Sequence, residues 1–279
     1  MGEPGVGSDA VETDRPRIDT SVAHPARRYN YWLGGKDNFQ ADRESGDAIA
    51  EAFPTVRLAA LENRAFMRRA VTYLTGVGVR QFLDIGTGIP APDNTHQVAQ
   101  AIAPESRVVY VDNDPIVLSH ARALLTSTST GATAYLEADL RQYREILAHP
   151  DLLRTIDLHQ PVALLLVAIM HFIYDHDEPY AIVGGLMDAL PSGSHLVMSH
   201  ATAEWAPPAN ADEWLATPGR LVAGSIQPRS LEEFTPFFEG LELVEPGYVP
   251  CSEWRDEDEP KPRPTPHETS TRVAVGRKP

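Results

Sequence analysis

Along almost the whole chain, short continuous apolar runs alternate with segments whose apolar residues recur at helical spacing. Short apolar runs, typical of strands buried on both faces, predict strands at 81–85, 108–111, 133–136, 162–168, 194–199, 241–244 and 271–275. Apolar residues at helical spacing predict helices at 25–33, 42–53, 55–75, 94–103, 115–126, 142–149, 178–190 and 230–239. This alternation predicts a parallel sheet covered by helices on both faces, with the most apolar strand, 162–168, at its centre.

Two segments depart from this pattern. Residues 1–22 combine scattered acids with Gly, Pro and Ser, and we expect a disordered tail there. Residues 253–268 are rich in acids and prolines and are expected to form a solvated loop, with apolar sequence on both sides. We therefore expect one domain, 23–279, with a helical lid at 23–75 and an α/β core at 81–279.

Composition narrows the classes of function. The chain has 279 residues, of which 39 are acidic and 24 are Lys or Arg, so its formal net charge is −15. This charge repels a phosphate backbone and disfavours a nucleic-acid partner. The longest apolar run, 162–170, is much shorter than the roughly 20 residues of a membrane span, and no secretory signal is visible at residues 1–14. Cys251 is the single cysteine, so no intrachain disulfide forms, and we expect a cytoplasmic protein.

The strongest chemical signal is the segment 82–90, FLDIGTGIP. An apolar strand runs into Asp84 and a Gly-x-Gly turn, where the absence of Cβ lets a ligand approach the backbone. A helix follows with Asn94 as its expected N-cap, and the next strand ends at Asp112, 24 residues after Gly88. An acid at about this distance holds ribose hydroxyls in nucleotide-binding βαβ units. The alternative is a tight turn with an acid that caps the next helix.

The chain lacks the third glycine of the dinucleotide-binding fingerprint G-x-G-x-x-G, and this indicates a different ligand. That glycine would fall at position 91, where the chain has Ala91 between Pro90 and Pro92. Two prolines stiffen the turn that would hold a pyrophosphate. A ligand without phosphates, such as S-adenosylmethionine, fits this turn better.

Several segments now resemble a known family. FLDIGTG, YVDNDP and LEAD at 136–139 resemble the class I S-adenosylmethionine-dependent methyltransferases. HPARRYNYWLGGKDNFQADRE (24–44), VVYVDNDPIVL (108–118) and the apolar strand ending in MHF (170–172) are similar, more narrowly, to the S-adenosyl methyltransferase family, whose substrates are generally unassigned. The resemblance covers roughly residues 22–279.

The resemblance implies a Rossmann-like α/β fold with a seven-stranded, mostly parallel sheet. Its last strand, 271–275, would be antiparallel and inserted beside the fifth. The cofactor would be S-adenosylmethionine, with Asp84, Gly86 and Gly88 at its methionine end and Asp112 on the ribose. Asn113 would lie beside the adenine, and Asp139 would reach the adenine amino group. Thr87, Leu140 and Tyr29 complete the expected cofactor-binding residues.

Residues 28–39, which precede the sheet, are dense in aromatic, amide and charged side chains. In the functional interpretation they fold over the cofactor and shape the acceptor pocket, where an aromatic face would attract the sulfonium. In the structural interpretation their Tyr and Trp side chains pack on the sheet edge. Both interpretations remain open from the sequence.

His171 and His200 follow two strands that the class order makes neighbours. Ligands bind beyond the carboxyl ends of parallel strands, so both imidazoles are candidates to orient or deprotonate a methyl acceptor, His171 first. Asp175, His176 and Asp177 resemble a metal cluster, but we favour solvated residues that cap a helix and expect no metal. Residues 253–255 and Arg220 are weaker candidates for an acceptor site.

These observations favour methyl transfer from S-adenosylmethionine to a small-molecule acceptor. The alternative is a catalytically silent S-adenosylmethionine binder, such as a regulatory partner or a sensor. A third interpretation, a nucleotide-sugar or nicotinamide enzyme, needs a phosphate cradle that Pro90 and Pro92 disfavour. The sequence leaves the acceptor, its reacting atom and the oligomeric state open.

Overall fold

The computed structural model describes residues 18–117, 119, 127–206 and 226–279. Residues 18–22 form no helix or strand. The rest of the expected tail, most of the helix expected at 115–126, and Arg220 lie outside the described residues.

The described strands form one mixed sheet with the order β3-β2-β1-β4-β5-β8-β6, and β7 pairs with β8. The strands β1 to β5 are parallel, and β8 runs antiparallel between β5 and β6. Their bounds are β1 Gln81–Ile85, β2 Arg107–Asp112, β3 Ala132–Glu137, β4 Ala163–Val167, β5 His195–Ala201, β6 Glu242–Leu243, β7 Val249–Pro250 and β8 Thr271–Arg277. The antiparallel strand beside the fifth is confirmed. The count of seven is wrong, because within the described residues β7 makes an eighth strand.

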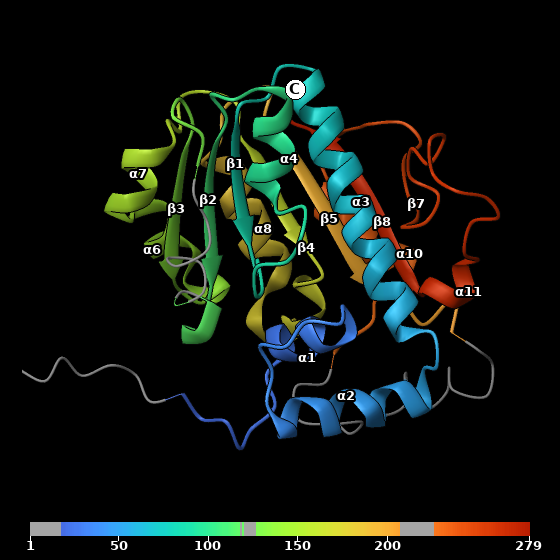
Figure 1. The fold of residues 1–279 in the computed structure, drawn as a ribbon. Helices are drawn as coiled ribbons and strands as arrows, with labels where there is room; N and C mark the ends of the chain where they lie inside the picture. The colour runs from blue at the N-terminus through green and yellow to red at the C-terminus, as the bar shows by residue number, and fades with distance from the viewer. Residues whose placement is uncertain (1–17, 118, 120–126, 207–225) are drawn as a thin grey trace, which may run out of the picture.

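Helices cover both faces of the sheet (Figure 1). The α-helices are α1 Pro25–Trp32, α2 Gln40–Ala52, α3 Val56–Gly76, α4 Thr95–Ile102, α6 Tyr143–Ala148, α7 Pro150–Thr155, α8 Pro179–Asp188, α10 Leu231–Phe234 and α11 Pro266–Thr269. Short 3-10 turns lie at η1 Leu140–Gln142, η2 Met170–Phe172, η3 Asp175–Asp177 and η4 Thr235–Phe238.

Alternation along each strand divides the core into two layers. Phe82 of β1 packs with α3 residues such as Phe66 on one face, while its neighbour Leu83 packs with α8 residues such as Leu186 on the other. All four strands at the centre of the sheet are almost fully buried, which explains their continuous apolar runs.

The three helices of the expected lid, 23–75, lie in two different places. Figure 1 shows α1 and α2 across the ends of the strands, whereas α3 lies along one face of the sheet. Asp42 of α2 accepts hydrogen bonds from the backbone N–H groups of His24 and Phe39, each at 2.8 Å, and so closes the loop that joins the two helices. The Arg27 guanidinium of α1 pairs with Asp114 at 3.1 Å, which ties α1 to the loop after β2.

The segment 253–268 is not a fully solvated loop, which corrects the sequence interpretation. Trp254 has no exposed surface and its ring centroid lies 5.5 Å from that of Phe66 in the core. Glu259 pairs with Arg69 at 3.0 Å, and a further ion pair joins Arg263 to α3. Since Trp254 fills the core, it is not available to an acceptor site.

Candidate functional site

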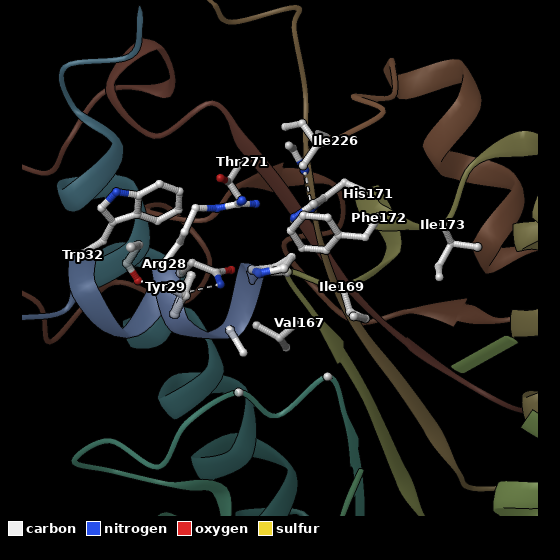
Figure 2. Close-up of a pocket in the computed structure, with 18 of the residues that line it drawn as sticks. Arg28, Tyr29, Trp32, Val167, Ile169, His171, Phe172, Ile173, Ile226 and Thr271 are labelled. Atoms are coloured by element: carbon white, nitrogen blue, oxygen red, sulfur yellow. Dashed lines mark hydrogen bonds between the residues drawn. The ribbon is translucent and has the colours of Figure 1, made fainter. Parts of the chain in front are cut away.

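A cavity of about 540 Å³ lies beyond the carboxyl ends of the central strands, under α1 and α2. This volume falls within the range of roughly 300–1,000 Å³ that is typical of small-molecule sites. All nine of the expected cofactor-binding residues line it, and so does His171. The wall opposite β1 and β2 is formed by the α1–α3 segment, which contributes Arg28, Tyr29 and Trp32 (Figure 2).

The Gly-x-Gly turn forms the floor of one end of the cavity. Gly86 and Gly88 have φ angles of 76° and 68°, a backbone region that favours glycine. A Cβ at Gly86 would lie 2.7 Å from the Ile169 side chain, so this position also needs glycine for packing. A Cβ at Gly88 would meet nothing within 4 Å, and the backbone there is open to a ligand.

Asp112 faces this turn from the end of β2. One carboxylate oxygen accepts from the backbone N–H of Gly88 at 2.8 Å, and the other accepts from that of Asp114 at 3.0 Å. Burial raises the pKa of Asp112 to about 6. A carboxylate offers about four lone-pair positions, so each oxygen keeps one for a ligand hydroxyl.

Two further carboxylates line the same end of the cavity. Asp84 accepts a hydrogen bond of 2.6 Å from the hydroxyl of Thr95, and burial raises its pKa to about 6. Asp139 follows β3 and accepts from the Asn113 side-chain amide at 3.3 Å and from the Arg141 backbone at 2.9 Å.

The aromatic residues of the lid both pack and line the cavity. The Tyr29 hydroxyl donates to the Ala60 carbonyl at 2.9 Å and accepts from the Asn63 amide at 3.0 Å. Burial raises the pKa of Tyr29 to about 12, so this phenol stays neutral. The Trp32 indole N–H donates to the Gly46 carbonyl at 3.2 Å, which leaves its ring against the cavity. Thus the two interpretations of residues 28–39 are compatible.

The two histidines have different surroundings. His171, on η2, lines the cavity, and its pKa falls to about 3, chiefly because the ring is buried. His200 is 1% exposed and does not line the cavity. Its Nδ1 contacts the Ala201 carbonyl at 2.8 Å and its Nε2 contacts Arg229 at 2.9 Å. The expectation that both imidazoles flank one crevice therefore holds only for His171.

The acids near η3 are engaged by arginines. Asp175 accepts from Arg229 at 2.8 Å, and Asp177 pairs with Arg141 at 3.0 Å. Throughout the part of the chain that the structure describes, no group of three or more His, Cys, Asp or Glu side chains is arranged to hold a metal ion.

The donor and acceptor chemistry of the cavity narrows its ligand. Asp84 and Asp112, whose carboxylates form no ion pair within the described residues, would repel phosphates and favour hydrogen-bond donors, whereas Asp139 is paired with Arg141 at 3.2 Å. A nucleoside with hydroxyl, ammonium and amino groups and without phosphates meets that requirement. A family model described as S-adenosyl methyltransferase matches residues 11–279. The chain belongs to this family.

Its cofactor is S-adenosylmethionine, and its fold is the Rossmann-like class I methyltransferase fold. Among solved structures, a DUF574 family protein from Streptomyces avermitilis MA-4680 is 46% identical, with a TM-score of 0.86 over 94% of this chain and 100% of that one. A candidate methyltransferase from Thermobifida fusca YX is 40% identical, with a TM-score of 0.84 over 96% of this chain and 99% of that one. No curated protein matches the sequence.

Around the cavity of this S-adenosyl methyltransferase, sequence reasoning missed three residues. Asp114 and Asn63 contact residues of α1, and Arg229 underlies His171 and His200. Asp114 belongs to the YVDNDP segment, whereas Asn63 and Arg229 stand in no motif, and the partners of all three are more than 25 positions away in the sequence. None of the described helices is long and apolar enough to cross a bilayer.

Proposed function

We propose that this protein transfers the methyl group of S-adenosylmethionine to a small-molecule acceptor bound beside His171 in the same cavity. The observation that carries the proposal is the continuity of that cavity. It extends from the carboxylates at the ends of β1 to β3 to the lid helices α1 and α2. Its volume of about 540 Å³ lies within the range of small-molecule sites.

In this proposal the carboxylates hold the cofactor. Asp112 accepts hydrogen bonds from the ribose hydroxyls, and Asp84 faces the methionine ammonium across the turn of Gly86, Thr87 and Gly88. Asn113 and Asp139 lie beside the adenine, whose apolar face packs on Leu140. Tyr29 closes the cavity over the cofactor from α1.

The opposite end of the cavity suits an acceptor with an apolar body. Lid residues on this side form a hydrophobic cluster in which Phe53 and Val56 are buried and Trp32 and Ile49 are partly buried. These side chains line the cavity and give this end an apolar surface. The bound cofactor supplies an electrophilic methyl carbon on a sulfonium, and the chain has mainly to hold an acceptor in line with it.

The test uses S-adenosylmethionine with a labelled methyl group and the small-molecule fraction of an extract from the source organism. We expect label in a new low-molecular-weight product and stoichiometric formation of S-adenosylhomocysteine, both strongly reduced with Asp112→Ala when the cofactor is not saturating. Tight cofactor binding without label transfer to any extract component would instead support the silent binder.

A further inference from the structure

The surroundings of His171 determine which ring nitrogen carries its proton. The backbone N–H of Ala201 points at Nδ1, at a long 3.5 Å, and an imidazole nitrogen that faces a donor carries no proton. Burial, together with the charges of Arg229 and Arg28, lowers the pKa of His171 to about 3. The neutral ring therefore carries its single proton on Nε2 and offers a hydrogen-bond donor there.

A buried layer behind His171 fixes this arrangement. The rings of His171 and His200 meet edge to face, with centroids 5.7 Å apart. Arg229 donates to the carbonyls of Met170 at 3.2 Å and Ile173 at 3.0 Å, which bracket the η2 turn. The turn that carries His171 is thus held by a guanidinium whose side chain is 1% exposed.

The charges that face His171 from its neighbouring elements are mainly positive. Arg229 lies behind it, and Arg28 of α1 reaches into the cavity across from it (Figure 2). Asp175, which pairs with Arg229, has a side chain that is 67% exposed, so solvent screens most of its charge. On β8, Arg272 is paired with Glu204.

We propose that the methyl acceptor binds as an anionic oxygen, a carboxylate or an ionised phenol, that accepts a hydrogen bond from Nε2–H of neutral His171. This inference rests on the proposed function and names its substrate class. A buried donor surrounded by cations stabilises an oxyanion and disfavours a protonated amine.

This assignment removes the need for a general base. The oxyanion uses one lone pair to form the new O–CH₃ bond, while the S–CH₃ bond breaks and its electron pair stays on sulfur. No proton is transferred in this step, and the product is a neutral ester or ether. A neutral His171, whose ring resists protonation, is suited to this step because it orients the oxygen without taking up a proton.

The first test is independent of any ligand. Long-range ¹H–¹⁵N spectra of the protein labelled in histidine report the tautomer of each ring, and His171→Asn identifies the His171 signal. We expect His171 to be neutral and protonated on Nε2 from pH 6 to 8. A ring protonated on Nδ1, or on both nitrogens, overturns the proposal.

The second test uses 4-nitrophenol, whose phenol and phenolate absorb at different wavelengths, with protein saturated with S-adenosylhomocysteine. We expect the pKa of the bound probe to fall by about one unit, as a nearby donor and cations favour the charged form. His171→Leu should abolish the shift, and His176→Leu, at a side chain that is 79% exposed, should retain it. A probe pKa that is unchanged or raised by the protein overturns the proposal.

Calorimetry of S-adenosylmethionine on the same samples separates this inference from the proposed function. Normal cofactor binding with an unshifted probe contradicts the anionic acceptor alone. Failure to bind the cofactor contradicts the proposed function and the inference with it.

Discussion

Arg229 donates a hydrogen bond to Nε2 of His200 at 2.9 Å, and this contact makes His200 a structural residue. Arginine can only donate and the Ala201 carbonyl can only accept, so His200 must be neutral with its proton on Nδ1. A proton added to His200 would face the guanidinium. His200 is therefore no alternative base for His171.

Replacing Arg229 should destabilise the protein and release His200. Arg229→Gln loses the bonds to Met170 and Ile173, and unsatisfied buried partners cost about 1–3 kcal/mol each. Urea unfolding should show a clear loss of stability, smaller for Arg229→Lys. Histidine ¹⁵N spectra should show His200 no longer fixed as the Nδ1–H tautomer. An unchanged tautomer and stability in Arg229→Gln would refute the positioning role.

The ion pair between Asp114 and Arg27 should hold α1 in place over the cavity. Asp114→Asn keeps an oxygen for the backbone of Ile116 but removes the negative charge that faces Arg27. Because breaking a buried ion pair leaves an uncompensated charge, we expect faster amide hydrogen exchange over 24–33 and weaker cofactor binding. The matched control is Glu105→Gln, which removes an exposed pair with Arg80 away from α1. Unaltered exchange over 24–33 would show that α1 is held by other contacts.

Substitutions of His171 should separate orientation from proton removal. His171→Ala should lower turnover by about 10²-fold, at the lower end of the effect of a positioned catalytic group, with cofactor affinity nearly intact. His171→Asn keeps an N–H donor and should restore much of the rate. Steady-state kinetics with the identified acceptor measures both. If Asn proves as poor as Ala, the donor role is wrong.

Cofactor affinity should weaken as the pH falls through about 6. The pKa of Asp112 is raised to about 6 by burial, and only its ionised form offers a charged acceptor to the ribose. At pH 5 about one carboxyl in eleven is ionised, so the affinity should be about tenfold weaker than at pH 7.5. Asp112→Asn should flatten this profile. A dependence that persists in Asp112→Asn and disappears in Asp84→Asn would assign it to Asp84, whose pKa is also raised to about 6.

The same two carboxyls give a stability prediction of the opposite sign. Their folded-state pKa values lie above the ordinary value of 3.8. The folded protein therefore binds more protons than the unfolded chain between about pH 4 and 6, and it loses stability as the pH rises through that window. Thermal unfolding of the ligand-free protein with Asp84→Asn and Asp112→Asn should be less sensitive to pH there.

Local patterns predict the part of the cavity formed by β1, the glycine turn and β2 well. The strand 81–85, the glycine turn and Asp112 lie within one βαβ unit, so their spacing alone brings them together. By contrast β7 has two residues and exists only because it pairs with β8. The helix α7 is six residues long and too short for a periodic pattern.

Other parts of the molecule depend on contacts that are distant in sequence. The sequence places His200 after its strand, as it does His171, but in the structure His200 lies within β5, and Arg229, 29 positions later, packs its guanidinium against the buried ring. Likewise the composition of segment 253–268 predicts a solvated loop, because it does not show that Glu259 pairs with Arg69 and that Arg263 pairs with Glu62 of α3. The burial of these residues is determined by tertiary contacts and not by local propensity.

The most direct test of the whole account is calorimetric titration of S-adenosylmethionine into wild-type protein and Asp112→Ala, with Asp151→Ala as a control. Asp151 lies on α7 with a side chain that is 46% exposed, outside the cavity. Loss of a charged acceptor costs about 1.5–3 kcal/mol, so Asp112→Ala should bind roughly ten- to hundredfold more weakly. The control should bind as the wild type does. Equal affinity of Asp112→Ala and wild type, with both folded, would contradict the placement of the cofactor in this cavity.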